Sequence, residues 1–395
     1  MPISVRPKPY IIPEYSLTGD LLSYLTCGLQ YRYHNKGSLP PSKPVQLWFG
    51  EFIHGVMEEA YLEWRDNNRQ QFPWNWDSII RDIEMEINRR LRSRGLYSPP
   101  RLFCPFDSTM TSRGLCPDVN HPHKMIASKR AETAINTWGQ HLFPLISEVE
   151  VKLSGLRDMP NYIENISRSN YYCINGIVDV ISFFNLQNAP SGNLILHYIQ
   201  NNENVRHIIN NLNINNYEII IDYKGMRRPS NTSESWSHHE WQIKTYTWLR
   251  AKQSRSRRVI AGILFYLNEL EPSQEDLISL KDELENYSTD ILPEGRDRYL
   301  IQNWRRNTTP PDLTRTFREQ RSIKIVPVDE ESIQLSLANF DNVVNNIEKS
   351  VVSEIDGNSI INSWCTNPEE RTCTACDFKT FCPNPLPRPY QPTVR

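Results

Sequence analysis

The spacing of apolar residues predicts two helices in the first part of the chain. Leucines recur on one face of residues 16–34, with Ser16 as a candidate N-cap. A second helix is expected over residues 45–65, after a proline-containing loop. Its apolar stripe repeats every three or four positions and comprises Phe49, Phe52, Ile53, Val56, Met57, Ala60, Tyr61 and Trp64. Residues 66–140 are expected to form a mostly helical insertion.

Short β-rich runs follow at residues 148–153, 171–184, 194–199, 217–224 and 259–267. An asparagine-rich tract at 200–217 is expected to be an irregular loop, and a helix over 238–252 separates the last two runs. Residues 268–325 are expected to form an acidic helical insertion, followed by a helix over 329–349. Strands followed by a helix and another strand predict a mixed α/β (α+β) core over residues 145–267.

Composition narrows the class of protein. The chain has 395 residues, is 38% apolar and carries a formal charge of −2, so binding of nucleic acid would need a local basic patch. No run of about eighteen apolar residues is present, which argues against a membrane span. The opening decapeptide MPISVRPKPY has no following apolar stretch, so we expect no secretory signal and a cytoplasmic location. Glycine is scarce, at 15 residues, which disfavours a glycine-looped dinucleotide fold.

Residues 217–225 carry the clearest chemical signal. Ile219 to Ile221 form a β-branched run typical of a strand buried on both faces. Asp222 and Lys224 then follow two positions apart, so their side chains share one face at the carboxyl end of the strand. Taken alone, this pattern also fits an ordinary strand end that turns into solvent.

Three further segments favour a site. Asp179 lies in an otherwise apolar strand, where a buried carboxylate needs a cation or strong donors. The helix at 45–65 contains Gly50-x3-His54-x3-Glu58 at its edge, and the helix at 238–252 contains Gln242-x3-Tyr246, which places two polar groups one turn apart. One imidazole, two carboxylates and an amine supply ligands for a hard divalent cation with a positive group beside it.

The order of these motifs resembles the PD-(D/E)XK nuclease superfamily, specifically its RecB-like branch. The resemblance implies a restriction-endonuclease-like core in which a mixed central sheet is flanked by helices. It implies that His54, Asp179, Asp222 and the carbonyl of Tyr223 bind Mg²⁺ or Mn²⁺ and that Lys224 orients the attacking water. Gln242 and Tyr246 would hold the DNA strand and Lys224, and Glu150 would have a supporting role. Val178 stands where the superfamily name has proline, a common variant in this branch.

Three cysteines near the C-terminus follow the pattern C-x2-C-x5-C: Cys373, Cys376 and Cys382. Three thiolates do not complete a four-thiolate shell, and Cys27 is the candidate for the fourth ligand. The pattern resembles the iron–sulfur members of the same branch, including CRISPR-associated prespacer exonucleases and AddB-type nuclease domains. It implies a structural 4Fe-4S cluster in a lobe made of residues 1–34 and 365–385. A zinc knuckle, or free buried thiols together with Cys365, is the alternative.

Two weaker patterns complete the picture. Cys104, Cys116, His121 and His123 form a second possible zinc site, although their spacing is not a common zinc pattern. Arg227 and Arg228 follow Lys224 closely enough to be candidate DNA-binding residues. Arg89, Arg90, Arg92 and Arg94 lie at the end of an expected helix, where such a charge run is usually a solvated face.

The resulting hypothesis is a single-domain, metal-dependent DNA nuclease that acts on single strands or ends, as an exonuclease by resemblance. The alternatives are a nucleic-acid-binding or scaffold subunit with a degenerate nuclease fold, and a redox-sensing iron–sulfur protein. A phosphate-binding G-x4-GK[ST] sequence is absent, so a helicase or CRISPR adaptation partner is expected on a separate chain. Polarity of digestion and the choice between DNA and RNA stay open.

Overall fold

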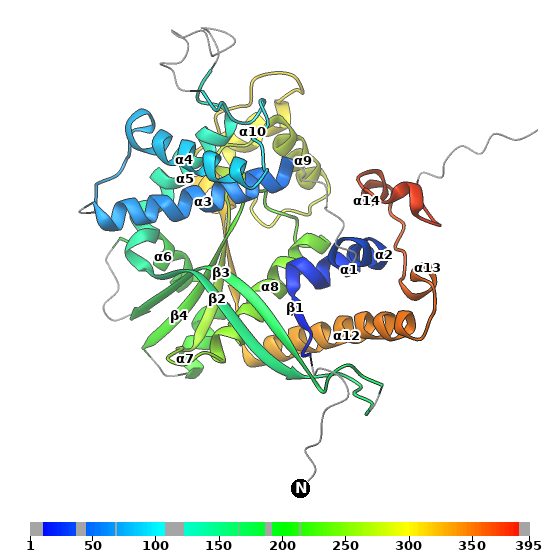
Figure 1. The fold of residues 1–395 in the computed structure, drawn as a ribbon. Helices are drawn as coiled ribbons and strands as arrows, with labels where there is room; N and C mark the ends of the chain where they lie inside the picture. The colour runs from blue at the N-terminus through cyan, green and yellow to red at the C-terminus, as the bar shows by residue number, and fades with distance from the viewer. Residues whose placement is uncertain are drawn as a thin grey trace, which may run out of the picture.

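The computed structural model describes residues 11–36, 45–67, 69–106, 122–164, 166–185, 192–212 and 215–386. Within them, six strands form one mixed sheet in the order β1-β3-β4-β5-β6, with β2 paired to β3 (Figure 1). The β2–β3, β3–β4 and β5–β6 pairs are antiparallel, and the β1–β3 and β4–β5 pairs are parallel. The strands are β1 (Glu14–Ser16), β2 (Ile146–Asp158), β3 (Tyr171–Asn185), β4 (Asn216–Lys224), β5 (Val259–Tyr266) and β6 (Ile323–Pro327).

Helices cover both faces of this sheet. One face is packed against α3 (Val45–Asp66), α4 (Arg81–Ser93), α5 (Ile126–Leu142), α6 (Leu194–Asn201) and α7 (Glu203–Leu212). The other face is packed against α8 (Glu234–Ala251), α12 (Glu330–Ile355) and the N-terminal segment of residues 15–31. Figure 1 shows α3 above the β2–β3 hairpin and α12 to the right of it. The predicted mixed α/β core flanked by helices is therefore confirmed.

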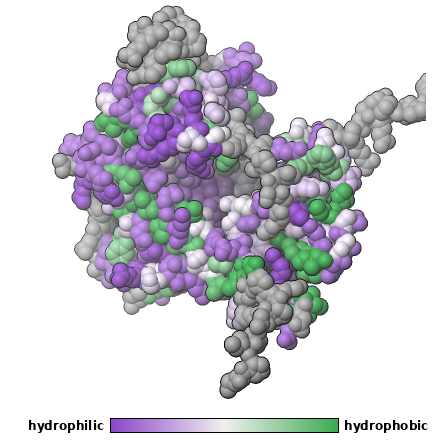
Figure 2. Space-filling model, viewed as in Figure 1, coloured by the Kyte–Doolittle hydropathy of each residue, from purple (hydrophilic) through white to green (hydrophobic). Residues whose placement is uncertain are grey.

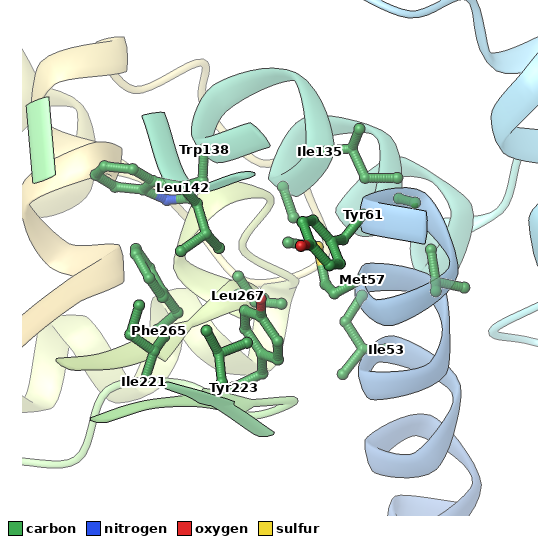
Figure 3. Packing of buried hydrophobic residues seen from close by; sticks show 14 of the residues in the cluster. Ile53, Met57, Tyr61, Ile135, Trp138, Leu142, Ile221, Tyr223, Phe265 and Leu267 are labelled. Atoms are coloured by element: carbon green, nitrogen blue, oxygen red, sulfur yellow. The ribbon is translucent and has the colours of Figure 1, made fainter. Parts of the chain in front are cut away.

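Side-chain alternation along β4 divides its residues between these two layers. Ile219, Ile221 and Tyr223 belong to the core beneath α3 and α5, whereas Ile220 belongs to the core on the α8 side. Figure 3 shows the first of these cores, in which residues of α3 and α5 lie above β4 and β5: Ile53, Met57, Tyr61, Ile135, Trp138, Leu142, Ile221, Tyr223, Phe265 and Leu267. The even-numbered residues Asp222 and Lys224 consequently lie on the side of α8.

The region expected to be an acidic helical insertion contains α9 (Gln274–Glu285), α10 (Gly295–Asn303) and α11 (Arg315–Ser322). These helices have a small core of their own, made of Leu277, Leu280, Ile301, Trp304, Leu313 and Phe317. The insertion is thus helical as predicted, but it ends at Ser322, because residues 323–327 form β6. Among the described helices, none combines the length and the apolar character needed to cross a membrane.

Several predicted elements are confirmed and others are wrong. The helix expected at 45–65 is α3, and all eight residues of its predicted stripe are buried. Residues 194–199, expected to be a strand, form helix α6, capped by Asn193, whose side chain accepts a hydrogen bond from Leu196 N. Part of the asparagine-rich tract forms α7 rather than a loop.

The helix expected over residues 16–34 is interrupted. Ser16 is the N-cap as predicted, and the segment continues through α1 (Leu22–Thr26) to α2 (Gly28–Tyr31). Between them, Cys27 has an extended backbone, with φ −167° and ψ 111°. The break therefore falls on the residue that sequence analysis assigned as a thiolate ligand. The two C-terminal helices, α13 (Ile360–Ser363) and α14 (Glu370–Thr374), lie beside this segment (Figure 1).

Candidate functional site

Six of the predicted site residues line one cleft. The cleft has a volume of about 1030 Å³ and opens between α3 and the β2–β3 hairpin. Figure 2 shows the same face of the molecule hollowed at this place, with mainly hydrophilic residues around the opening. The predicted residues that line it are His54, Asp179, Asp222, Lys224, Gln242 and Tyr246. Four elements, α3, β3, β4 and α8, supply them.

A local separation of two strands positions Asp179. β3 pairs with β4 as far as Val180, which lies opposite Ile221, and it pairs with β1 only as far as Asn175. Among the described residues, 176–179 of β3 therefore have no paired strand on the edge that faces β1 and β4. Asp179 Oδ2 accepts a hydrogen bond of 2.7 Å from the backbone N–H of Tyr223. The Asp179 carboxylate thus takes the place of the backbone carbonyl that would accept this hydrogen bond if β3 and β4 were still paired. The bond holds the carboxylate close to the end of β4.

Two cations neutralise the pair of carboxylates. His54 Nδ1 lies 3.3 Å from Asp179 Oδ1, and Lys224 Nζ lies 2.6 Å from Asp222 Oδ2. The Lys224 ammonium, which has three N–H donors, also donates a hydrogen bond of 2.6 Å to Gln242 Oε1. Lys224 therefore links Asp222 to Gln242.

Gln242 connects the two sides of the site. Its Nε2 donates to Asp222 Oδ1 at 3.1 Å and to the hydroxyl oxygen of Tyr246 at 3.0 Å, while its Oε1 accepts from Lys224. The lysine can only donate, so this network fixes the orientation of the amide. Gly176 on β3 gives Tyr246 its space, because a Cβ at that position would lie 2.6 Å from the Tyr246 ring.

The electrostatics follow from burial and these contacts. Burial opposes protonation of His54, but the neighbouring Asp179 carboxylate outweighs it and raises the pKa of His54 to about 9. Burial by itself would raise the pKa of Asp179, yet His54 and the Tyr223 N–H lower that pKa below its ordinary value. Burial raises the pKa of Asp222; Lys224 opposes this change, and Asp179 adds to it. The site holds a cationic imidazole and an ammonium beside two carboxyl groups.

Further acidic residues lie at one end of the cleft. Glu58, one turn after His54, and Glu150 on β2 both line it. Burial and the Asp179 charge raise the pKa of Glu150 to about 7. Glu150 also has a positive φ of 48°, which marks an irregularity in β2 at this point.

The chemistry of the donor set fits a hard divalent cation, since carboxylate and imidazole groups converge on the cleft. Within the described residues, however, no group of three or more His, Cys, Asp or Glu side chains is arranged so that it could hold a metal ion. In this structure one oxygen of Asp179 faces His54 and one oxygen of Asp222 faces Lys224. Tyr223 presents its side chain to the hydrophobic core, and only its backbone is available at the site.

The four predicted cluster cysteines also come together. Cys27, Cys373, Cys376 and Cys382 line one small cavity on the C-terminal side of the molecule. Burial raises the pKa of the Cys376 thiol, and the nearby thiols of Cys27, Cys382 and Cys373 raise it further. Thiols are the donor type that an iron–sulfur cluster requires, but among the described residues these cysteines, like the cleft residues, are not arranged so that three or more could hold a metal ion. Cys365 does not line this cavity; its thiol lies 3.6 Å from the Tyr24 hydroxyl.

Arg227 and Arg228 lie outside the cleft and have structural partners. Arg228 is 4% exposed, pairs with Asp290 and donates to the carbonyl oxygens of Arg321 and Ile323. Arg227 pairs with Glu283. Arg228 is buried in an ion network and neither residue lines the cleft, whereas Arg227 is partly exposed, so DNA binding by these arginines stays a prediction.

The second zinc pattern is partly outside the described residues, which include neither Cys116 nor His121. Cys104 Sγ and His123 Nδ1 are 3.4 Å apart, and His123 Nδ1 also lies 3.1 Å from the carbonyl oxygen of Phe106.

Sequence analysis did not identify Leu47 and Lys152, which line the cleft. It noted Arg94 only as part of a charge run, and Arg94 lines the cleft as well. Lys152 could have been found from the strand period, because Glu150 and Lys152 lie two apart on β2 and share a face.

Comparison with protein families gives a match to part of the chain. The family model for the PD-(D/E)XK nuclease superfamily matches residues 212–383, a stretch that includes Asp222, Lys224, Gln242, Tyr246 and the three C-terminal cysteines. His54, Asp179 and Cys27 lie before the matched region. No curated protein matches the sequence.

Proposed function

We propose that this protein is a RecB-like, metal-dependent nuclease that hydrolyses phosphodiester bonds of DNA and acts on single strands or strand ends. One observation carries the proposal: an imidazole, two carboxylates and an ammonium from α3, β3 and β4 line one open cleft. The superfamily match over residues 212–383 supports the same class of reaction.

The carboxylates of Asp179 and Asp222, the His54 imidazole and the Tyr223 carbonyl would hold Mg²⁺ or Mn²⁺. When bound, such an ion activates water and stabilises the charge that develops on the phosphate. Ligation requires a neutral imidazole, so His54 gives up its proton when the site is loaded.

Lys224 has two tasks in this proposal, and the first is to orient the attacking water. Its ammonium offsets the negative charge of the phosphate, which otherwise repels the attacking water. Gln242 keeps the ammonium in position through the 2.6 Å hydrogen bond to its Oε1, and Tyr246 anchors the other end of the amide. Gln242 and Tyr246 therefore act as positioning residues for Lys224 and Asp222.

We propose in addition that Cys27, Cys373, Cys376 and Cys382 hold a structural 4Fe-4S cluster. Support comes from their common cavity and from the extended backbone at Cys27, which interrupts a helical segment beside the C-terminal cysteines. A zinc ion bound by the same thiols is the competing occupant, and metal analysis of the purified protein separates the two.

The test uses protein purified without oxygen, labelled single-stranded and duplex DNA, and Mn²⁺ or Mg²⁺. Asp222→Ala and Lys224→Ala should each lower the cleavage rate by several powers of ten, while Lys349→Ala, an exposed residue of α12, should cleave like wild type. Wild-type protein that binds DNA tightly but cuts none of these substrates with either metal would instead favour a nucleic-acid-binding subunit. Variants as active as wild type would refute the assignment of the site.

A further inference from the structure

The cleft face of the β2–β3 hairpin is organised in rows of paired residues. Lys152 is the register partner of Ile177, and Ser154 is the register partner of Asn175. Glu150 lies between the Val149–Val180 and Val151–Val178 pairs, and is therefore opposite Asp179. The six residues of these rows all line the cleft: Glu150, Asp179, Lys152, Ile177, Ser154 and Asn175. Successive rows are about 6–7 Å apart, the rise of two strand residues.

These rows extend from the candidate catalytic residues in one direction. The hairpin residues that line the cleft have numbers 150 to 154 on β2 and 175 to 179 on β3. Beyond the row of Asp179, Ile181 is buried in the core and does not reach the cleft. A bound strand that passes Asp179 must therefore continue over Lys152 and Ile177 toward Ser154 and Asn175.

The second row combines a cation with an aliphatic surface. Lys152 is exposed, and within the described residues it forms no ion pair. Ile177 is 46% exposed although it lies in the middle of a long strand. A free ammonium suits a backbone phosphate, and an exposed aliphatic side chain suits the face of a base or a sugar.

The facing wall repeats this pair of features. Leu47, at the start of α3, is 42% exposed and lines the cleft. Arg94, just after α4, lines it too and is held by a 2.9 Å ion pair with Glu51, one turn along α3 from Leu47. Both walls therefore offer one cationic and one aliphatic group on the same side of His54.

The charges on the other side of His54 are different. Glu58 and Glu150 lie there, where they repel each other and the Asp179 carboxylate, and Arg90 also lines the cleft but is paired with Glu59 and Glu86. Because Arg94 is likewise offset by Glu51, the ammonium of Lys152 is the charge that attracts a phosphate backbone to its row and away from Glu58.

We infer that the Lys152–Ile177 row, faced by Leu47 and Arg94, binds the nucleotide next to the scissile phosphate in an unpaired strand. Lys152 contacts its phosphate, and Ile177 and Leu47 contact its base. This assignment rests on the proposed nuclease function and adds the side on which the strand lies. Base faces are covered by stacking in a duplex, so contact with two aliphatic groups requires an unstacked base and selects single strands.

The experiment measures binding without cleavage. Fluorescence anisotropy with a labelled oligothymidylate in EDTA gives the affinity of wild type and of the variants Lys152→Ala, Lys152→Arg and Ile177→Ala. Lys152→Ala should weaken binding about tenfold and reduce the slope of log affinity against log salt by about one, whereas Lys152→Arg should restore both. Ile177→Ala should weaken single-strand binding by about 5- to 30-fold and leave duplex binding unchanged.

Matched controls are Lys349→Ala on α12 and Ile361→Ala on α13, both exposed and outside the cleft; Ile361 is 47% exposed, close to the value for Ile177. Both should bind as wild type does. If wild type cleaves DNA while Lys152→Ala and Ile177→Ala retain full affinity, this inference is wrong and the nuclease function stands. If wild type neither binds nor cleaves nucleic acid, the proposed function fails and this inference fails with it.

Discussion

Asp179 Oδ2 accepts a 2.7 Å hydrogen bond from the backbone N–H of Tyr223, across the point where β3 and β4 separate. The same carboxylate therefore satisfies a buried backbone donor through one oxygen and faces His54 through the other. Structural and chemical roles are combined in one side chain, and substitution can separate them.

Asp179→Asn should remain folded, because its amide oxygen can still accept from Tyr223. Asp179→Ala leaves that buried N–H without a partner and should lower the free energy of unfolding by about 1–3 kcal/mol. Both variants should lose nuclease activity, since neither has the second carboxylate oxygen. Urea denaturation followed by circular dichroism checks the stability difference, and equal stability of the two variants would contradict the role of the hydrogen bond.

Gly176→Ala should disturb the site through Tyr246. A Cβ at residue 176 would lie 2.6 Å from the Tyr246 ring, which must shift and take Gln242 with it. Overpacking of this kind costs about 1–3 kcal/mol, so both the melting temperature and the cleavage rate should fall.

Gly50→Ala is the matched control for this effect. A Cβ at Gly50 has no neighbour within 4 Å, and the residue lies inside α3. This variant should be as stable as wild type or more stable by about 0.5–1 kcal/mol, because alanine loses less conformational freedom in a helix. A Gly176→Ala protein with the melting temperature and activity of wild type would show that Tyr246 does not need this space.

Cys27→Ser and Cys376→Ser should each remove the brown colour and the bound iron of anaerobically purified protein. Cys365→Ser should retain both, since Cys365 is exposed and does not line the cavity of the four thiols. Visible absorbance together with iron, sulfide and zinc analysis measures the outcome. Stoichiometric zinc with no iron in the wild type would assign the cavity to a zinc site.

Arg228→Ala should destabilise the fold by about 3–5 kcal/mol, the usual effect of breaking a buried ion pair. The substitution removes one of the two cationic partners of Asp290, the other being Lys324, and the donor to two backbone carbonyls. Guanidinium denaturation checks this value. A stable Arg228→Ala protein with weakened DNA binding would support the expectation drawn from its position after Lys224.

Glu84 gives a pH-dependent prediction. Burial raises its pKa to about 7, although Ser128 and Arg81 partly oppose the change. The folded state therefore retains a proton that the unfolded state loses above pH ~4.5, so this group makes the protein less stable as pH rises from about 4.5 to 7.

In Glu84→Gln this dependence should be absent. The stability of the variant relative to wild type should increase between pH 5 and pH 8 by up to about 3 kcal/mol, in proportion to the pKa shift. Chemical denaturation at several pH values tests the sign. A difference that stays constant or decreases with pH would show that Glu84 is ionised throughout this range.

The elements with strong periodicity could be predicted from sequence. The stripe of α3 and the β-branched run of β4 specify both the element and the buried face, and they locate His54, Asp222 and Lys224 correctly on their elements. Tertiary proximity between Asp179 and His54 followed from the resemblance alone, because their contact spans two elements that are distant in sequence.

The errors have local causes. The short run Leu194–Asn201 contains β-prone residues, and such runs are ambiguous between strand and helix. In α7 the helical signal was present: Val205, Ile208, Ile209 and Leu212 have the i, i+3, i+4, i+7 spacing, which the many asparagines obscured. The burial of Arg228 could not be predicted because its acceptor Asp290 lies 62 positions away.

The N-terminal segment depends on partners that are synthesised much later. Tyr15 donates to Glu348, 333 positions along the chain, Arg32 pairs with Glu354, and Cys27 shares its cavity with Cys373. During synthesis on the ribosome, these contacts of Tyr15, Arg32 and Cys27 cannot form until nearly the whole polypeptide has emerged. A product that ends before residue 348 would keep the pairing of β1 with β3 but would lack the contacts of Tyr15 and Arg32 with α12 and three of the four thiols, so it should be cleared by proteolysis rather than accumulate as an active fragment.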